Sequence, residues 1–470
     1  MLTLADIFEA LTHTRPHAPQ IISEAAIDSR QVIPASMFVA LVGENVDGHQ
    51  FIGEAFRRGA QVALVERDLS TVFPTVNLMT ETLPAELPQL DQPFCLLVPD
   101  SLKALQEIAR FWRKKLNIRV IGITGSVGKS TTKELVAEVL SQRYRTLKNV
   151  GNFNNEIGLP LTILRLSKNH QRAVLEMGFF VPGEIRFLCE IAQPSVGVVT
   201  NIGAVHAERA GSLEAIARGK AELIESLPKN GTAILNYDDP YIRPMAEKTQ
   251  ARVLFYGLDR NAHIWADDIE GLGLQGIRFR LHYHHEILHI RVPLIGRHSV
   301  HTVLRAAAVG LAEELSWDQI IHGLQQGHAQ LRLAAVTAPN GALILDDTYN
   351  ASPDSVLAAL NLLDELPGNK CAVLGEMLEL GPYENQGHEM VGVRVAQVAQ
   401  RLVAVGEKAK IIAASARNAG LSGKAITWVA NVPEAIKTLN GTLHSGDVVL
   451  VKGSHGLHME HIVNALEAEE

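Results

Sequence analysis

The segment RVIGITGSVGKSTTK, residues 119–133, constrains the fold more than any other stretch of the chain. A nearly continuous apolar run at 119–124 leads into a turn with two glycines, and a lysine opens the polar segment that follows. Apolar runs without polar alternation are typical of parallel strands that helices cover on both faces. The segment therefore predicts a strand, a tight turn and a helix, which is the repeating unit of a doubly wound α/β fold.

The same strand pattern recurs along the chain. Apolar runs at 173–177, 196–200, 232–236 and 252–257 predict further strands of one parallel sheet, and alternation at 277–294 predicts an antiparallel hairpin added to it. Runs at 341–347, 370–377, 401–407 and 447–454 predict a second doubly wound unit. A proline-rich stretch at 82–99 closes the first region, which mixes short strands and helices.

We therefore expect an α/β protein of three domains. The length of 470 residues exceeds what a single core normally organises. The expected boundaries are 1–98 for a small N-terminal α/β domain, 99–335 for a central parallel-sheet domain with the hairpin, and 336–470 for a C-terminal Rossmann-like domain.

Composition excludes several classes of function. A formal net charge of −8 leaves no basic excess to hold nucleic acid. The chain has 3 cysteines, far apart, which fits a reducing cytoplasm and offers no disulfide framework. No apolar run approaches the roughly 20 residues that a membrane helix needs, so we expect no membrane insertion.

The glycine turn has the chemistry of a phosphate-binding loop. Glycines at 125 and 128 let backbone amides point inward as an anion nest, and Lys129 places a cation at a helix N-terminus. Hydroxyls follow at 130–132, where a magnesium-bound nucleotide needs one. Ile123 stands where the longer G-x-x-x-x-G-K-[ST] pattern has a glycine, so the loop is a shorter variant. The alternative is a purely structural turn.

Two polar residues follow neighbouring strands of the same predicted sheet. Glu176 ends the run AVLEM, and His206 follows the next strand in TNIGAVH. Open parallel sheets bind ligands at the carboxyl ends of their strands, so both residues are candidates for the catalytic centre. The alternatives are a glutamate that caps a helix and a structural histidine.

An ordered set of motifs resembles the Mur ligase family over nearly the full length. The set comprises IDSRQVIPASMFVALVGENVDGHQFI (27–52), TGSVGKS (124–130), NNEIGLP (154–160), LEMG (175–178), TNIGAVH (200–206), RGKAEL (218–223), DDTYNASPDS (346–355), LGEMLELG (374–381) and VKGSHGLHME (451–460). Each motif alone is modest, whereas the ordered set is specific.

The resemblance implies an ATP-dependent, ADP-forming amide ligase of the cytoplasmic stage of peptidoglycan synthesis. Within the family, the motif at 154–160 favours joining of D-Ala-D-Ala to UDP-N-acetylmuramoyl-tripeptide through an acyl phosphate. A carboxylate lacks a leaving group until it is phosphorylated, and the joining of two anions requires nearby cations. The expected cofactors are ATP and two Mg²⁺, and the expected assembly is a monomer.

Residue roles follow from the matched motifs. The loop residues Gly125, Ser126, Val127, Gly128, Lys129, Ser130 and Thr131 would bind ATP. Ser130 and Glu176 would hold one Mg²⁺, with His206 helping to hold a second. Lys220 matches the family lysine that CO₂ carbamylates, because a carbamate is an anionic ligand where an ammonium would repel the metal.

Further matches concern the ends of the substrates. Arg332 would reach the nucleotide phosphates, and Asp346 or Asp347 would meet the ribose. The predicted substrate contacts are Asp28, Ser29 and Arg30 for the uridine diphosphate, Asn154 and Asn155 for the sugar-peptide, and Lys452 and Ser454 for the dipeptide. The alternatives for the asparagine pair and for Arg30 are turn residues without ligands.

The chain departs from the family pattern in a few places. Ser299 and Thr302 replace two asparagines near the adenine, and His455 replaces an arginine. The histidines at 282, 284, 285 and 289 lie on the polar face of the hairpin, and we expect them to be solvated. Rival hypotheses are a sibling or folylpolyglutamate-type ligase with another acceptor, a P-loop ATPase that drives motion, and a degenerate homologue that only binds the precursor.

Overall fold

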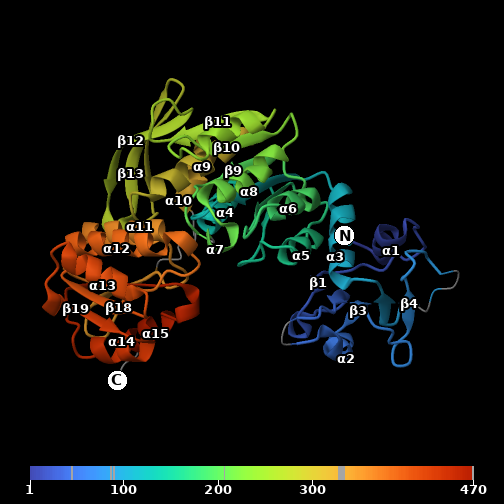
Figure 1. The fold of residues 1–470 in the computed structure, drawn as a ribbon. Coiled ribbons are helices and arrows are strands. Elements are labelled where there is room, and N and C mark those ends of the chain that lie inside the picture. The colour runs from blue at the N-terminus through green and yellow to red at the C-terminus, as the bar shows by residue number, and fades with distance from the viewer. Residues whose placement is uncertain (44–45, 85–86, 88–89, 206, 327–333, 468–470) are drawn as a thin grey trace.

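The computed structural model describes residues 1–43, 46–84, 87, 90–205, 207–326 and 334–467. Over these residues the strands form three sheets, each with its own helices, and the middle unit lies between the other two (Figure 1). The predicted α/β fold, with a hairpin on the central sheet, is confirmed. Within the described ranges, no helix combines the length and apolar character needed to cross a bilayer.

The N-terminal sheet is entirely parallel, with strand order β1-β2-β3-β5-β4. Its strands are β1 (Ala25–Ala26), β2 (Ser36–Val39), β3 (Ala60–Val65), β4 (Thr75–Asn77) and β5 (Phe94–Leu97), and its helices are α1 (Leu4–Thr12) and α2 (Ile52–Arg57). Helix α1 begins at a capping box, in which Thr3 and Asp6 exchange hydrogen bonds with each other's backbone amides.

Helix α3 (Ser101–Lys114) joins the first unit to the second. The side chain of Asp100 caps its N-terminus, and its last turn is basic, as the helix dipole favours. It packs between α1 and α5 (Gly158–Leu164), and the buried Trp112 donates its indole N–H to the carbonyl of Leu166 at 2.9 Å. The apolar cores of the first two units are therefore continuous through this helix.

The central sheet runs β14-β13-β12-β11-β10-β9-β6-β8-β7. Its strands are β6 (Arg119–Thr124), β7 (Thr146–Lys148), β8 (Arg172–Glu176), β9 (Val196–Val199), β10 (Thr232–Asn236), β11 (Arg252–Gly257), β12 (Ile264–Gly271), β13 (Ile277–Tyr283) and β14 (Glu286–Val292). Neighbours from β7 to β12 pair in parallel, and β13 and β14 form the antiparallel hairpin.

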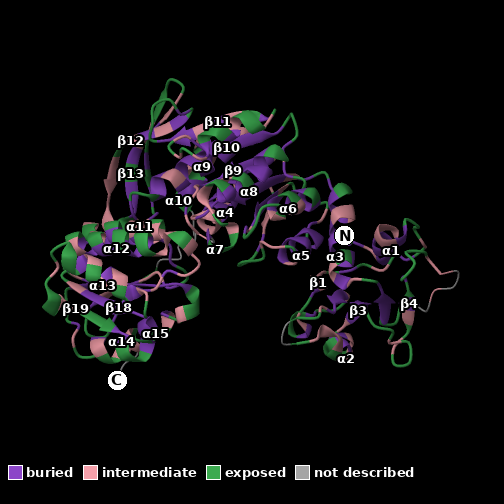
Figure 2. Cartoon of the chain, viewed as in Figure 1, coloured by how far each residue is buried: buried purple, intermediate pink, exposed green. Residues whose placement is uncertain are grey.

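Helices cover both faces of this sheet, which explains its buried, apolar strands (Figure 2). They are α4 (Lys129–Ser141), α5, α6 (Glu184–Ala192), α7 (Ala207–Ala210), α8 (Leu213–Glu225), α9 (Ser299–Ala312) and α10 (Trp317–Gln326). Strand β6 lies between β8 and β9. The strands β7 and β8 lie on one side of β6, and the strands from β9 onward lie on its other side. Such a change in strand order opens a crevice at the carboxyl ends of the strands.

The hairpin histidines follow the expectation at three positions. His284, His285 and His289 are exposed. His282 differs, because its ring stacks on Trp265 at 3.7 Å between centroids and its Nε2 lies 3.0 Å from a carboxylate oxygen of Asp267. A cross-strand aromatic partner, which the alternation pattern does not reveal, covers this histidine.

The C-terminal sheet has the order β15-β16-β20-β17-β18-β19 and is parallel except for the edge strand β15. Its strands are β15 (Ala334–Thr337), β16 (Leu343–Asp346), β17 (Asn369–Gly375), β18 (Arg401–Val405), β19 (Ile426–Val429) and β20 (Asp447–Lys452). Its helices are α11 (Pro353–Glu365), α12 (Glu384–Val398), α13 (Ala409–Asn418), α14 (Val432–Leu439) and α15 (Glu460–Glu467). Strand β15 includes residues 334 and 335, which precede the expected boundary at 336.

The capping box of α1 yields a test of stability against pH. Burial alone would raise the pKa of Asp6, but hydrogen bonds from Arg15, Thr3 and Lys115 lower it to about 2. A carboxylate with a depressed pKa stabilises the folded state above its unfolded value, near 3.8, and loses that contribution as the pH falls toward 2. The shift corresponds to roughly 2 kcal/mol at neutral pH.

We expect Asp6→Asn to speed hydrogen exchange of the α1 amides by about tenfold or more at pH 7, since 1.4 kcal/mol is a factor of ten. The difference from the wild-type protein should shrink between pH 4 and pH 2, when both are compared at each pH by mass spectrometry. Asp91→Asn, at an exposed position of the same unit, is the control. A difference at pH 2 that is as large as the one at pH 7 would contradict the ionic account.

Candidate active site

The glycine turn after β6 forms a loop that ends at the N-terminus of α4. Gly125 and Gly128 have φ angles of 145° and 81°, which side-chain-bearing residues rarely adopt. A Cβ on Gly125 would also lie 1.8 Å from Oγ1 of Thr200, so only glycine fits. Lys129 is the first residue of α4, and its Nζ donates to the carbonyls of Gly125 and Ser126 at 2.9 and 3.2 Å. Backbone amides, a cation and a helix N-terminus thus meet at one point.

The segment after β9 holds this loop in place. The side-chain oxygen of Asn201 accepts a hydrogen bond from the amide of Val127 at 2.8 Å, and Thr200 donates its hydroxyl to the carbonyl of Val127 at 2.7 Å. The hydroxyl of Ser126 donates to the carbonyl of Gly203 and accepts from its amide. Ser126 therefore braces the loop against this segment, which contains loop-positioning residues that the sequence did not single out.

Glu176 lies next to the hydroxyl of Ser130. Ser130 Oγ donates a hydrogen bond to Glu176 Oε2 at 2.7 Å. The side-chain amide of Asn154 donates to the other carboxylate oxygen, Oε1, at 2.9 Å. Two ligands at adjacent corners of an octahedral magnesium ion, each about 2.1 Å from the metal, are separated by about 3 Å. The spacing and the oxygen chemistry of Ser130 and Glu176 therefore fit a shared Mg²⁺.

Lys220 approaches the same loop from α8. Its side chain is buried, its Nζ donates to the carbonyl of Gly125 at 3.0 Å, and it lies 4.6 Å from the ring centroid of Phe179. Gly219 permits this packing, because a Cβ there would lie 2.0 Å from the Phe179 ring. Burial, together with the charge of Lys129, holds the pKa of Lys220 well below its usual value. The predicted metal residue His206 lies outside the described residues.

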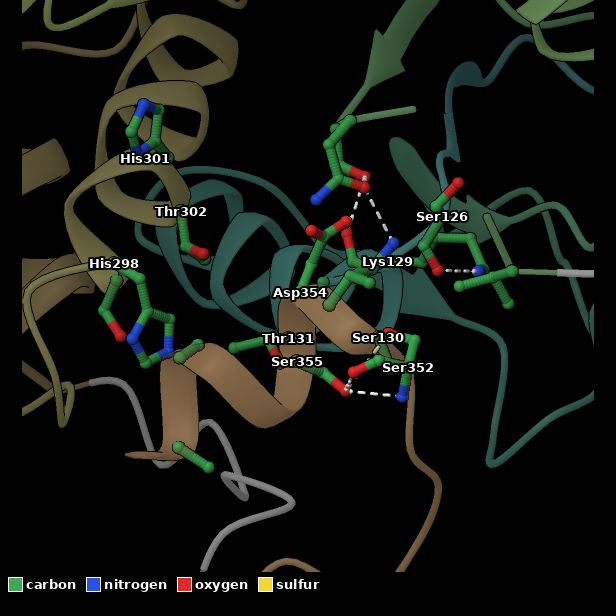
Figure 3. Close-up of a pocket in the computed structure, with 18 of the residues that line it drawn as sticks. Ser126, Lys129, Ser130, Thr131, His298, His301, Thr302, Ser352, Asp354 and Ser355 are labelled. Carbon is green, nitrogen blue, oxygen red and sulfur yellow. Dashed lines mark hydrogen bonds between the residues drawn. The ribbon is translucent and has the colours of Figure 1, made fainter. Parts of the chain in front are cut away.

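A cavity of about 410 Å³ opens beside the loop, between the central and C-terminal units (Figure 3). The loop and α4 supply Ser126, Lys129, Ser130 and Thr131, and Ser352, Asp354 and Ser355 of α11 and its cap line the other side. The site is therefore built by two units.

The two aspartates predicted to contact the ribose, Asp346 and Asp347, have different surroundings in the structure. Asp347 lines the cavity, and its carboxylate pairs with the buried Lys452 at 2.7 Å. Lys452 also lines the cavity, whose opposite wall carries the phosphate loop. The carboxylate of Asp346 instead accepts hydrogen bonds from the amide and hydroxyl of Thr348. Arg332 lies outside the described residues.

The far end of the cavity is lined by α9. The hydroxyl of Ser299 donates to the carbonyl of Ile295 at 2.7 Å, and that of Thr302 accepts from Arg305 at 2.7 Å. Arg305 is buried, also donates to Thr132, and would lie 2.8 Å from a Cβ placed on Gly128. Arg305 thus ties α9 to the phosphate loop, a role that its place in an apolar helix did not reveal.

Other predicted substrate residues lie away from this cavity or make local contacts. Asn155 accepts hydrogen bonds from the amides of Ile157 and Gly158 at the start of α5, as in the turn alternative. The hydroxyl of Ser454 accepts from the amide of Leu378 at 2.9 Å.

The three N-terminal candidates are held by their own unit. Arg30 is exposed and pairs with Asp28 at 2.8 Å, while Ser29 donates to Glu54 at 3.0 Å. A small cavity of about 80 Å³ lies next to them, lined by residues of β1 and, across the junction, by Phe153 and Arg165. It leaves room for part of a ligand between the first and second units.

Asp354 is a further cavity residue that the sequence pointed to only as part of a motif. Its carboxyl group faces the phosphate loop, and its Oδ2 lies 2.6 Å from where a Cβ of Gly203 would be. Burial, with the nearby charge of Asp239, raises its pKa.

The fold and this site define a three-part α/β enzyme with a variant P-loop and an interdomain nucleotide-sized cavity. Family models match in order along the chain: the Mur ligase family catalytic domain at residues 22–113, the Mur ligase middle domain at 123–310 and the Mur ligase glutamate ligase domain at 331–455. The chain belongs to the Mur ligase family.

Relatives extend over nearly the whole chain. The UDP-N-acetylmuramoyl-tripeptide–D-alanyl-D-alanine ligase of Synechocystis sp. is 35% identical, with 95% of this chain and 92% of that protein covered. The crystal structure of MurF from Acinetobacter baumannii aligns with a TM-score of 0.84 at 31% identity, covering 99% and 98% of the two chains. MurF from Thermotoga maritima in complex with ADP aligns with a TM-score of 0.78 at 29% identity, covering 94% and 97%.

The contact between Ser130 and Glu176 can be tested by nucleotide binding. We expect Glu176→Gln to weaken the magnesium-dependent part of ADP affinity by at least about tenfold, because the variant loses the anionic ligand. ADP binding without magnesium should change little. Calorimetry with and without Mg²⁺ separates the magnesium-dependent part of the ADP affinity from the magnesium-independent part.

Glu138→Gln is the matched control for this measurement. Glu138 lies on the same helix, α4, and its carboxylate faces Lys148 at 3.9 Å, away from the loop. Equal loss of affinity with and without Mg²⁺ in Glu176→Gln would argue against a metal role for this carboxylate.

Proposed function

We propose that this protein joins D-Ala-D-Ala to UDP-N-acetylmuramoyl-tripeptide with the conversion of ATP to ADP and phosphate. The observation that carries the proposal is the cavity in which the phosphate loop and Lys129 face the C-terminal unit, with Lys220 and Glu176 hydrogen-bonded to Gly125 and Ser130 of this loop, in a chain whose full-length relatives bear this ligase name. The ligase reaction needs such a site, because two anions and an amine must meet there.

The chemistry has two steps. The terminal carboxylate of the tripeptide attacks the γ-phosphorus of ATP, the bond to ADP breaks, and an acyl phosphate forms. The amine of D-Ala-D-Ala then attacks the carbonyl carbon, phosphate leaves with the bonding electrons, and the amine loses a proton. Lys129 and the N-terminus of α4 offset the charge that gathers on the phosphate in the first step.

Ser130 and Glu176 are the proposed ligands of one Mg²⁺, and His206 and Lys220 of a second. When bound, these ions neutralise phosphate oxygens. The buried amine of Lys220 suits carbamylation, because its lowered pKa favours the neutral form that attacks CO₂. The new N–C bond and the loss of a proton give an anionic carbamate.

The remaining roles extend this proposal to both ends of the substrates. Arg332 and Asp347 serve the nucleotide, and Lys452, which lines the cavity together with Asp347, contacts the dipeptide. Asn154 orients Glu176 near the reacting carboxylate, and the other proposed substrate contacts are Asp28, Ser29, Arg30, Asn155 and Ser454. We place the domains at 1–98, 99–333 and 334–470, with the last boundary moved from the expected 336 so that β15 stays whole, and the protein working as a cytoplasmic monomer.

An activity assay tests the function directly. We expect phosphate release and a product of the summed mass minus water only when ATP, Mg²⁺, UDP-N-acetylmuramoyl-tripeptide and D-Ala-D-Ala are all present. Lys129→Met should reduce the rate by about 10²–10³-fold, the usual effect of losing one transition-state charge contact. ATP hydrolysis that ignores both substrates would favour a motor-type ATPase, and tripeptide binding without turnover would favour a degenerate homologue.

Carbamylation of Lys220 has its own test. Enzyme depleted of CO₂ should lose activity and regain it on addition of bicarbonate, and ¹³C-bicarbonate should give a carbamate signal by NMR. Lys220→Arg should lack both, because a guanidinium does not form this adduct under these conditions. Lys229→Arg, at an exposed lysine on the loop after α8, is the control. Full activity of Lys220→Arg at every bicarbonate level would remove Lys220 from the metal site.

A further inference from the structure

We propose that the C-terminal unit carries a separate binding site for a transition-metal ion of the Zn²⁺ class, formed by His458, Glu460 and His461. These residues lie where the turn after β20 enters α15, at the C-terminal end of the fold (Figure 1). The site is distinct from the magnesium site proposed for the ligase reaction, and no step of that reaction uses it.

The geometry of the three side chains supports metal binding. One ligand atom from each lies within 4.8 Å of the other two. His458 Nδ1 and Glu460 Oε1 are 3.1 Å apart. Tetrahedral zinc with ligands at about 2.1 Å places them about 3.4 Å apart, so the pair of His458 and Glu460 already fits, and the ring nitrogen of His461 lies close enough to approach the same ion. His458 and His461 are exposed and Glu460 is partly exposed, which leaves space for water as a fourth ligand.

The backbone brings these residues together in a specific way. His458 adopts a left-handed conformation with φ of 54°, which turns the chain into α15. The amide of His461 donates to the carbonyl of His458 at 3.2 Å, which closes the turn. His455 stands beside the cluster, with its ring centroid 6.1 Å from that of His458. The ligands are therefore fixed on one short turn and do not depend on distant segments.

The donor set selects the class of metal. Two imidazoles and one carboxylate suit zinc and its neighbours, whereas magnesium prefers oxygen ligands alone. The helix dipole at the start of α15 opposes a cation, but the carboxylate of Glu460 offsets that charge. In the part of the chain that the structure describes, these three residues are the group whose ligand atoms all lie within 4.8 Å of one another. The histidines of the β13–β14 hairpin do not form such a group.

The position of the site gives it a consequence for the cavity. Strand β20 delivers Lys452 into the cavity, and Ser454 lies between that lysine and the histidine turn. A bound ion would tie the turn to α15 and stiffen the end of this strand. Metal occupancy therefore acts on a segment that the ligase reaction needs, without contact with the substrates.

The test uses the full chain, purified without a histidine tag. We expect Zn²⁺ titrated calorimetrically in excess Mg²⁺ to bind at one site per chain, and Co²⁺ to give the intense visible absorption of a four-coordinate ion. His458→Ala, His461→Ala and Glu460→Gln should each weaken this binding by at least about tenfold, because one of three ligands is lost. Circular dichroism of each variant confirms that it folds.

The controls use histidines that the structure leaves out of the cluster. His444→Ala removes an exposed histidine of the same unit, and the double variant His284→Ala/His285→Ala removes the turn of the hairpin. Both should bind Zn²⁺ like the wild-type protein. Binding that survives loss of His458 and His461, or that the hairpin variant abolishes, would overturn the proposal, as would the absence of saturable Zn²⁺ binding.

Discussion

The carbonyl of Gly125 accepts hydrogen bonds from both Lys129 and Lys220, and the rest of the site depends on this convergence. Burial of Lys220, and after it the charge of Lys129 at the same oxygen, lower the pKa of Lys220 and favour its neutral form. The same convergence requires a glycine at 125 and a glycine at 219, because side chains there would collide with Thr200 and Phe179. The backbone conformation at Gly125, the packing at Gly219 and the protonation of Lys220 therefore depend on one another.

Much of the fold could be predicted from the sequence, for a physical reason. Strands β6, β10 and β11 begin and end where the apolar runs do, because parallel strands buried on both faces leave no polar positions inside the run. The hairpin could also be predicted, because apolar and polar residues alternate along it. Short edge strands such as β7 and β19 were missed, since three or four half-exposed residues carry too little pattern.

Some residues of the candidate site could likewise be predicted from the sequence, and others could not. Lys129, Ser130 and Glu176 were predictable because local chain geometry places them at the carboxyl ends of adjacent strands. Arg305 was not, because it sits in an otherwise apolar helix whose contact with the loop arises only in three dimensions. Asp346 and Asp347 are adjacent in sequence, and only the register of β16 against β20 decides which one faces the cavity.

The ion pair between Asp347 and Lys452 joins two strands of the C-terminal sheet but forms part of the wall of a cavity whose opposite wall belongs to the central sheet. A nucleotide in that cavity is therefore a bridge, and its binding free energy includes the work of setting two separately folded bodies at one spacing. Small molecules that fill only one wall would bind without fixing that spacing. Affinity for the whole nucleotide thus depends on the spacing of the two units as well as on each single contact.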